Sequence, residues 1–273
     1  MIGQVITRYA VDRDHVSCFG YSMGAWGATS FCLRHPELFA SVYPDRPRPR
    51  QFGLPSLLPT PDAAHAVMAD GTTPYLERMD SVKWVSEHHE ELPFFVWDIG
   101  RNDGYGGPWQ NQIDLVDAFE ATHHGFAFIW NDGDHSGTAD IMAKIQAMYP
   151  PEKFSRVASY PAFSHSSIDD HLGNGDPTDG DLVGGINLGF DWSAVDDEPH
   201  RWSASISNTA TVAMTVDVTP RRCQKLKLQP GDMVSFTTST GGSGTLAADA
   251  WGLVTVPKVA IAPGQPTTVT VLH

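Results

Sequence analysis

The sequence predicts an α/β fold with a parallel sheet in its first half, followed by an all-β sandwich of immunoglobulin-like character. Up to about residue 150, short apolar runs alternate with segments of helical period. Beyond that point the helical period ends, and short alternating runs are separated by turns rich in Gly and Pro. We therefore expect an α/β domain at residues 1–152 and a β-sandwich domain at residues 153–273.

The elements of the first half follow from its apolar runs and helix signals. Pro36 ends the second predicted helix, and Thr138 caps the last one. The proline-rich segment 44–61 has no period, so we expect a surface excursion there, within a loop at 44–70 that shapes a substrate pocket. The expected strands are 14–19, 38–43, 92–100 and 125–132, and the expected helices are 2–9, 24–35, 73–90, 109–124 and 138–149.

The second half predicts seven short strands, which is typical of a sandwich. The preceding loop, 166–185, is dense in Gly and Asp but lacks the ligand spacing of an EF-hand, which favours a solvated linker over a calcium site. Aromatic faces suit sugar rings, so Trp192, Trp202 and Trp251 are candidate carbohydrate contacts or core residues, and we expect Trp251 to be buried. The expected strands are 201–207, 211–218, 224–229, 233–239, 244–250, 253–261 and 267–273.

The charge balance argues against some partners. The chain has 273 residues, of which 32 are acidic and 18 basic, giving a formal charge of −14. Such a charge repels phosphate backbones and anionic bilayers, so we expect neither nucleic acid nor a membrane as partner. Cys18, Cys32 and Cys223 form no CxxC pair, and we expect free thiols. His123 and His124 are expected at the surface or as capping residues.

The segment Gly20-Tyr21-Ser22-Met23-Gly24 matches the pattern G-x-S-x-G. A buried strand is expected before it and an amphipathic helix after it, which is the context of a nucleophile elbow. We expect both glycines to be required, because a side chain at either position would collide across the sharp turn. Ser22 is therefore the candidate nucleophile.

At this motif the sequence resembles the α/β-hydrolase superfamily, and "GYSMGAWGATSFCLRHPELFASV" is most similar to its esterase D, feruloyl esterase and polyhydroxyalkanoate depolymerase-like members. The resemblance covers about residues 1–150. In this fold the triad follows the order Ser, acid, His along the chain. The resemblance places the acid on Asp103 after "LPFFVWDIG", with Asp98 inside that strand as the rival, and the histidine on His135 after "GFAFIWNDG".

The resemblance implies a serine hydrolase that cleaves carboxylic esters through an acyl-enzyme, with a small-molecule or polymer-linked ester as substrate. The backbone N–H of Met23 would be one oxyanion donor, and Tyr21 and Trp26 would contact the substrate. We expect no cofactor. The run "HHEE" at residues 88–91 lacks the spacing of a zinc helix, so we expect no metal.

Two other functions stay open: a noncatalytic carbohydrate- or protein-binding protein with a vestigial hydrolase half, and a prolyl-oligopeptidase-like serine peptidase. In the family that the sequence resembles, the second oxyanion donor comes from a loop before the nucleophile, whereas only 21 residues precede Ser22. We therefore expect the C-terminal portion of the fold from a truncated gene. The alternatives are a misassigned start, a partner that supplies the missing strands, and a stable but impaired remnant.

An incomplete sheet has two further consequences. The strand before Ser22 would have an open edge, which offers a surface for self-association. The chain shows no export signal and no membrane span, so its location is open, and an extracytoplasmic location is favoured if an N-terminal segment has been lost.

Overall fold

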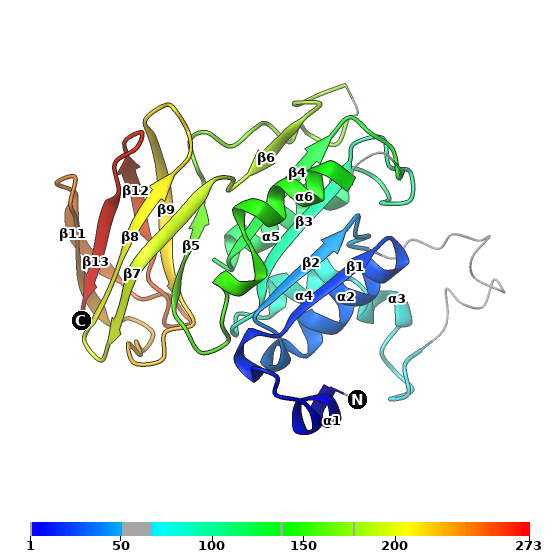
Figure 1. Cartoon of the computed structure of the whole chain (residues 1–273), viewed down its shortest axis with the longest axis horizontal. Coiled ribbons are helices and arrows are strands. Elements are labelled where there is room, and N and C mark those ends of the chain that lie inside the picture. The colour runs from blue at the N-terminus through cyan, green and yellow to red at the C-terminus, as the bar shows by residue number, and fades with distance from the viewer. Residues whose placement is uncertain (1, 51–66, 137–138, 177) are drawn as a thin grey trace.

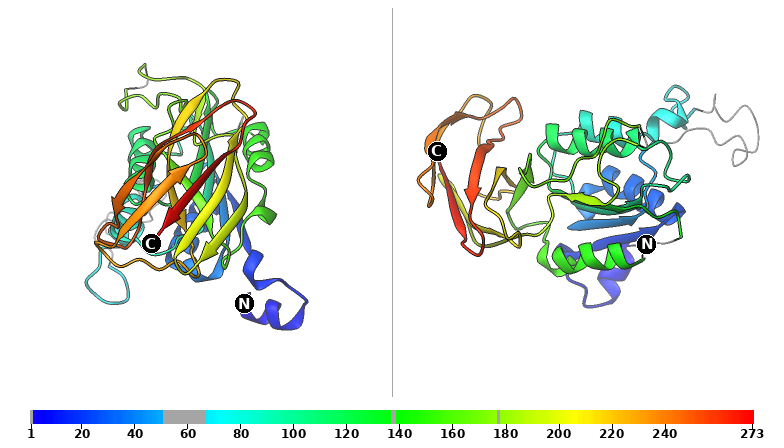
Figure 2. Two further views of the ribbon diagram at one scale, coloured as in Figure 1. Left: turned by 90° about the vertical axis from the view of Figure 1, so that its left-hand side faces the viewer. Right: turned by 90° about the horizontal axis from the view of Figure 1, so that it is seen from above.

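The structure is a computed structural model that describes residues 2–50, 67–136, 139–176 and 178–273. An α/β part and a β-rich part lie side by side (Figure 1), as two further views also show (Figure 2). Most of the predicted pocket loop and the predicted cap at position 138 lie outside the described residues. Within the described ranges, no helix is long and apolar enough to cross a bilayer.

The α/β part contains the strands β1 (Ser17–Tyr21), β2 (Ser41–Asp45), β3 (Phe94–Gly100), β4 (Phe126–Asn131) and β6 (Gly184–Ile186). Among the described residues they form one sheet in the order β1-β2-β3-β4-β6. The first four strands are parallel, and β6 pairs antiparallel with β4. The loops that follow the four parallel strands therefore meet at one end of the sheet, which is where sites form in such folds.

Helices cover both faces of this sheet. Phe95 and Trp97 of β3 share a core with three helices on one face, whereas Phe94 and Val96 share a core with one helix on the other face. This alternation follows from the pleat of a strand, which points successive side chains to opposite faces. The three helices are α2 (Met23–Arg34), α4 (Ser81–Glu87) and α5 (Gln110–Ala121), and the single helix is α6 (Ala139–Met148).

The predicted helix at 73–90 forms as two short helices, α3 (Tyr75–Arg78) and α4. Asp80 explains the break, because its carboxylate accepts a hydrogen bond from the backbone N–H of Lys83 at 2.9 Å and so caps α4. A further short helix, α1 (Ile2–Arg8), begins the described chain. The other helices and strands predicted for the first half are confirmed to within three residues at each end.

The β-rich part contains β5 (Tyr160–Ser164), β7 (Phe190–Glu198), β8 (Arg201–Asn208), β9 (Met214–Arg221), β10 (Met233–Thr238), β11 (Ser243–Ala247), β12 (Val256–Ile261) and β13 (Thr267–Leu272). In the described ranges they form two antiparallel sheets, β11-β10-β13-β8-β7 and β12-β9-β5, whose buried side chains share one core. An immunoglobulin-like character and the proposed domain limits stay predictions.

The predicted strand at 224–229 is wrong, and the structure shows why. The carboxylate of Asp197 accepts hydrogen bonds from the backbone N–H groups of Gln224, Lys225 and Leu226, so these donors are not available to a strand partner. The other six predicted strands are present, and β5 and β7 are additional.

The acidic loop at 166–185 bonds to its own backbone and returns the chain to the first sheet. Asp170 accepts the N–H of Gly185 at 2.8 Å, which fixes the start of β6, and Asp181 accepts the N–H of His171 at 2.7 Å. Asp169 accepts the N–H of Asn187 at 2.7 Å, and burial raises its pKa to about 7. These contacts agree with the predicted linker.

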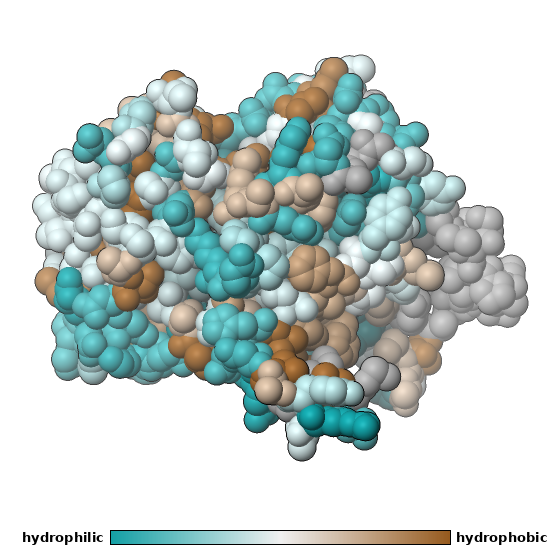
Figure 3. Space-filling view, in the orientation of Figure 1, coloured by the Kyte–Doolittle hydropathy of each residue, from teal (hydrophilic) through white to brown (hydrophobic). Residues whose placement is uncertain are grey.

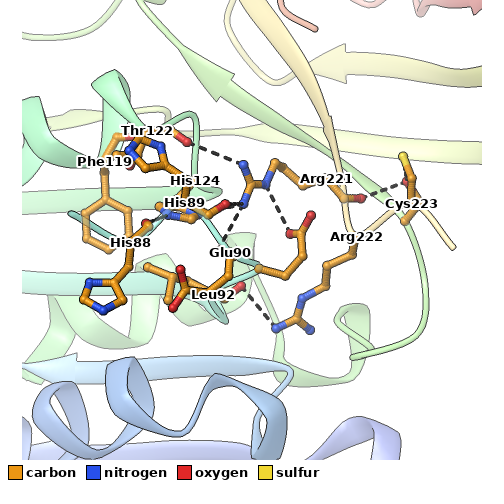
Figure 4. A network of polar contacts seen from close by, with 12 residues as sticks. His88, His89, Glu90, Leu92, Phe119, Thr122, His124, Arg221, Arg222 and Cys223 are labelled. Carbon is orange, nitrogen blue, oxygen red and sulfur yellow. Dashed lines mark hydrogen bonds and ion pairs between the residues drawn. The ribbon is translucent and has the colours of Figure 1, made fainter. Parts of the chain in front are cut away.

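Arg221, at the end of β9, joins the β-rich part to the α/β part (Figure 4). Its guanidinium lies 3.1 Å from the carboxylate of Glu91, 3.3 Å from the carbonyl oxygen of His89 and 3.0 Å from Nδ1 of His124. His124 is therefore buried in the junction and does not lie at the surface. The capping alternative is confirmed, because His123 has φ 54° and the backbone N–H groups of His123 and His124 donate to carbonyl oxygens in the last turn of α5. Nε2 of His124 lies 3.0 Å from the carbonyl oxygen of His88, which leaves Nδ1 as the acceptor for Arg221.

Arg222 makes a second set of contacts across the same junction (Figure 4). Its guanidinium donates to the carbonyl oxygens of Phe39 at 3.0 Å and Leu92 at 3.2 Å, which lie just before β2 and β3, and to that of Ser155 at 3.1 Å. The junction therefore holds the amino ends of the central strands, opposite the end where their following loops meet.

Trp251 is exposed rather than buried as predicted, with 54% of its surface accessible. It lies in a tight turn in which the carboxylate of Asp249 accepts a hydrogen bond from the backbone N–H of Trp251 at 2.8 Å. The path of this turn places the indole away from the core. Trp202 is fully buried and Trp192 packs against the core. Of the three candidate sugar contacts, Trp251 therefore has the most accessible ring.

β1 lies at the edge of the sheet, with β2 as its one partner within the described chain. Phe19 of β1 is 52% exposed and stacks on Tyr43 of β2, with ring centroids 4.6 Å apart. Apolar surface, brown in Figure 3, gathers over this region. The edge that the sequence predicted is therefore present in the described fold, while self-association through it stays a proposal.

Candidate active site

Ser22 occupies the turn between β1 and α2. Its backbone angles are φ 57° and ψ −118°, a left-handed region that a residue with a side chain rarely adopts. Its backbone N–H donates to the carbonyl oxygen of Asp45 at 2.9 Å, and its own carbonyl accepts the N–H of Trp26 at 3.1 Å. At such a strained turn the Ser22 hydroxyl projects away from β1 and α2, as in a nucleophile elbow.

The two glycines of the motif are not equivalent. A Cβ on Gly20 would lie 2.1 Å from the carbonyl oxygen of Gly24, which no real structure tolerates, so Gly20 is required. A Cβ on Gly24 would meet no atom within 4 Å, and Gly24 lies in the first turn of α2. The expectation that both glycines are required is therefore wrong for Gly24, because the collision involves its carbonyl rather than its α-carbon.

Asp103 lies in the turn after β3, where the sequence places the acid. Its side chain is buried, and its Oδ1 accepts the backbone N–H of Tyr105 at 2.9 Å and of Gly106 at 3.2 Å. Its Oδ2 lies 2.7 Å from Nδ1 of His135. Both oxygens are thus satisfied, and the carboxylate has one orientation relative to the imidazole.

His135 lies in the loop after β4, and its Nε2 is 2.7 Å from Oγ of Ser22. The loop is brought to this place by backbone packing against the turn after β3. The N–H of Asn102 donates to the carbonyl of Gly133 at 3.0 Å, and a Cβ on Gly100 would lie 2.3 Å from that same carbonyl oxygen. Gly100 is therefore a positioning residue that the sequence reasoning missed, although a glycine closing a buried strand signals a close backbone approach.

Two tyrosines flank the imidazole. The ring of Tyr105 lies 4.9 Å from that of His135 between centroids, and the ring of Tyr21 lies 5.6 Å from it. The hydroxyl of Tyr21 also donates to the backbone carbonyl of His135 at 2.9 Å. Tyr105 was not among the sequence-predicted site residues, because a tyrosine in a Gly-rich turn has no distinguishing pattern.

The other two predicted site residues lie on α2. The side chain of Met23 is 79% exposed, and its backbone N–H is in the first turn of the helix, where N–H groups have no intrahelical partner. Trp26 is half-buried one turn along, and its indole N–H is buried without a hydrogen-bond partner among the described residues. Its contact with a substrate stays a proposal.

The rival acid, Asp98, is fully buried within β3 and pairs with Asp45 at the end of β2. Burial raises the pKa of Asp45, while the neighbouring guanidinium of Arg46 opposes that shift. Asp103, rather than Asp98, is the carboxylate in contact with His135. Within the described ranges, no three metal-ligating side chains cluster.

The contacts among Ser22, His135 and Asp103 are suited to proton transfer from the hydroxyl. An imidazole with a carboxylate on Nδ1 and a hydroxyl on Nε2 can accept the hydroxyl proton and hold the resulting charge. A free backbone N–H at the start of a 12-residue helix adds a partial positive charge beside the hydroxyl.

No protein-family model matches the chain, and a search of curated proteins gives no match. Among solved structures it is similar to a ferulic acid esterase, with 22% identity and a TM-score of 0.37 over 50% of this chain and 51% of that one. It is similar to the fluorophosphonate-binding serine hydrolase FphF of Staphylococcus aureus, with 20% identity and a TM-score of 0.41 over 54% and 58% of the two chains.

A third similar structure is an S-formylglutathione hydrolase from Agrobacterium tumefaciens, with 23% identity and a TM-score of 0.35 over 54% and 50% of the two chains. The chain thus spans about half the length of each of these structures. By their names, these structures are an esterase, a serine hydrolase and an S-formylglutathione hydrolase.

Proposed function

We propose that this chain is a serine hydrolase that cleaves carboxylic esters, with Ser22 as nucleophile, His135 as general base and acid, and Asp103 as the orienting carboxylate. The observation that carries the proposal is the continuous chain of two 2.7 Å contacts from Ser22 through His135 to Asp103, at a strained strand-to-helix turn.

In the acylation step, Nε2 of His135 takes the proton from the Ser22 hydroxyl as its Oγ attacks the ester carbonyl. Asp103 holds Nδ1–H and stabilises the imidazolium that forms. The carbonyl oxygen becomes an oxyanion, which accepts a hydrogen bond from the backbone N–H of Met23. The imidazolium then gives its proton to the departing alcohol, which leaves an ester between the acyl group and Ser22.

In the deacylation step, the same imidazole removes a proton from a water molecule that attacks the acyl carbonyl. Collapse of the second oxyanion returns the proton to Ser22 Oγ and releases the carboxylic acid. Two contacts support one position of the base in both steps: Asp103 contacts Nδ1 of the imidazole, and the Tyr21 hydroxyl donates to the backbone carbonyl of His135.

Hydrolysis of p-nitrophenyl acetate tests the proposal. Ser22→Ala is expected to lower kcat by at least about 10⁴-fold, because no other group replaces the nucleophile. Ser86→Ala, a serine whose hydroxyl bonds within α4, provides the matched control and should retain the wild-type rate.

A fluorophosphonate probe gives a second measurement that does not depend on the choice of ester. Covalent labelling of the wild-type chain at Ser22, and its loss in Ser22→Ala, is the expected result. A wild-type chain that neither turns over the ester nor reacts with the probe would contradict the proposal and favour a noncatalytic binding protein.

A further inference from the structure

A second concave site lies at the junction of the two parts, away from Ser22. Its cavity volume is about 170 Å³. A cavity of about 150 Å³ holds a six-membered ring such as benzene, so this one has room for a single ring. It is lined by Glu91, Pro220, Cys223, Leu226, Lys227, Leu228, Trp251, Gly252, Leu253 and Val254.

Trp251 gives this groove an aromatic wall. One face of its indole is covered by His89, with ring centroids 3.3 Å apart and planes 13° from parallel. Trp251 lines the groove and is nevertheless 54% accessible, so ring surface that His89 does not cover is available to a ligand. Trp251 is the one aromatic among the described residues that line the groove.

The turn that carries Trp251 is fixed before any ligand arrives. Asp249 accepts the backbone N–H groups of Trp251 and Leu253 at 2.8 and 2.9 Å. Gly252 has φ 74°, and a Cβ there would lie 2.4 Å from the carbonyl oxygen of Leu228, so the turn is packed closely against its neighbour. A preset aromatic wall costs little ordering entropy on binding.

The polar groups of the groove carry one charge of each sign. The carboxylate of Glu91 is held 3.1 Å from Nε of Arg221, yet its side chain is 43% exposed and can accept further hydrogen bonds. The ammonium of Lys227 bonds to the carbonyl of Cys223 and is exposed, so it can donate. Because the carboxylate is already paired with the Arg221 guanidinium and the ammonium already bonds to a carbonyl, each suits a further hydrogen bond to a hydroxyl group of a neutral ligand.

We infer that this groove binds one ring of a neutral oligosaccharide. A pyranose has an apolar C–H face, which suits the negative face of the Trp251 indole, and an edge of hydroxyls for Glu91 and Lys227. A proline-rich peptide fits less well, because such peptides use grooves lined with several aromatic rings. The inference is independent of the proposed esterase activity.

Isothermal titration calorimetry on the full chain tests the inference, with cellohexaose, xylohexaose and mannohexaose as probes. At least one is expected to bind, with Trp251→Ala weakening binding about tenfold or more and Trp251→Phe weakening it less, because Phe retains an aromatic face. Lys227→Ala is expected to weaken binding about two- to fivefold through one lost hydrogen bond.

Tyr9→Ala is the matched control, since Tyr9 is also an exposed aromatic but follows α1 and does not line the groove. This variant should bind the sugar like the wild type. Circular dichroism and thermal melts verify that each variant is folded. Lack of binding by all three sugars, equal binding by Trp251→Ala, or binding of a proline-rich decapeptide in place of the sugars would overturn the inference.

Discussion

Tyr21 precedes the nucleophile, and its hydroxyl is already engaged. The sequence suggests a substrate contact, whereas the structure shows the phenol bonded to the backbone carbonyl of His135 at 2.9 Å. The guanidinium of Arg46 lies over the Tyr21 ring, 5.4 Å from its centroid. We therefore propose that Tyr21 positions the imidazole of His135 rather than contacting a substrate.

Tyr21→Phe tests this positioning role. Loss of one hydrogen bond to a backbone carbonyl costs about 1 kcal/mol, which corresponds to roughly a fivefold change. We expect kcat for p-nitrophenyl acetate to fall by about that factor while KM changes little. If KM rises and kcat is unchanged, Tyr21 contacts the substrate instead and the positioning role is excluded.

The elbow between β1 and α2 is the element that sets the nucleophile. Its geometry depends on Gly20, whose missing side chain lets the carbonyl of Gly24 approach. A Cβ on Gly24 would meet no atom within 4 Å. Within a helix, alanine is more favourable than glycine by up to about 1 kcal/mol.

A pair of alanine variants separates the two glycines. Gly20→Ala is expected to destabilise the chain by about 1–3 kcal/mol or more and to abolish activity, because the new methyl group overlaps a backbone carbonyl. Gly24→Ala is expected to leave the free energy of unfolding unchanged or higher. Urea denaturation measures both, and equal destabilisation by the two variants would argue against this reading of the turn.

The contrast between these elements shows what sequence can predict. The order strand, Ser22, helix, and the positions of Asp103 and His135 after buried strands, followed from local patterns and from the resemblance they supported. Two features did not follow from such patterns: the hydrogen bonds from the backbone N–H groups of residues 224–226 to Asp197, and the outward position of Trp251. Both depend on residues distant in sequence or on the exact path of a turn, which hydrophobic periodicity does not encode.

At the scale of the whole molecule, the paired arginines join the two parts. Arg221 is fully buried, and its contacts reach two separate segments of the α/β part, one at Glu91 and one at Thr122 and His124. A buried guanidinium destabilises the fold unless its donors are paired, and its buried acceptors are left unpaired if the guanidinium is removed.

The variant Arg221→Met tests how much these contacts contribute to the stability of the fold. Removal of the cation leaves its buried acceptors unpaired, and the free energy of unfolding is expected to fall by about 3–5 kcal/mol in urea denaturation. Glu91→Gln removes only a half-exposed partner and is expected to cost about 1 kcal/mol or less. A loss of about 1 kcal/mol or less for both variants would show that the Arg221 contacts contribute little to stability.

The junction also makes stability depend on pH through His124. Burial, and then the neighbouring Arg221 cation, lower the pKa of His124 well below 6.5. Between that lowered pKa and 6.5 the unfolded chain binds more protons than the folded one. The contribution of His124 to stability is therefore complete above about pH 6.5 and declines as the pH falls, by about 1.4 kcal/mol per unit.

Replacing His124 with Gln isolates this effect. Wild-type stability relative to His124→Gln is expected to decline from pH 6.5 downward, whereas the same change at the exposed His200 should leave the slope intact. Asp169, whose pKa is raised to about 7, has the opposite sign, losing its contribution as the pH rises from about 4 to 7. Asp169 is present in the wild type and in both variants, so its contribution cancels when their stabilities are compared.

The three proposed catalytic groups follow strands that differ in their number of neighbours, because β1 lies at the sheet edge. Asp103 and His135 follow β3 and β4, which have strand neighbours on both sides, whereas Ser22 follows a strand with one described neighbour. Amide hydrogen exchange should therefore be slowest in β3 and β4 and fastest in β1. A brief opening of that border strand carries the hydroxyl away from its imidazole while the rest of the sheet stays folded, so inactivation can precede unfolding.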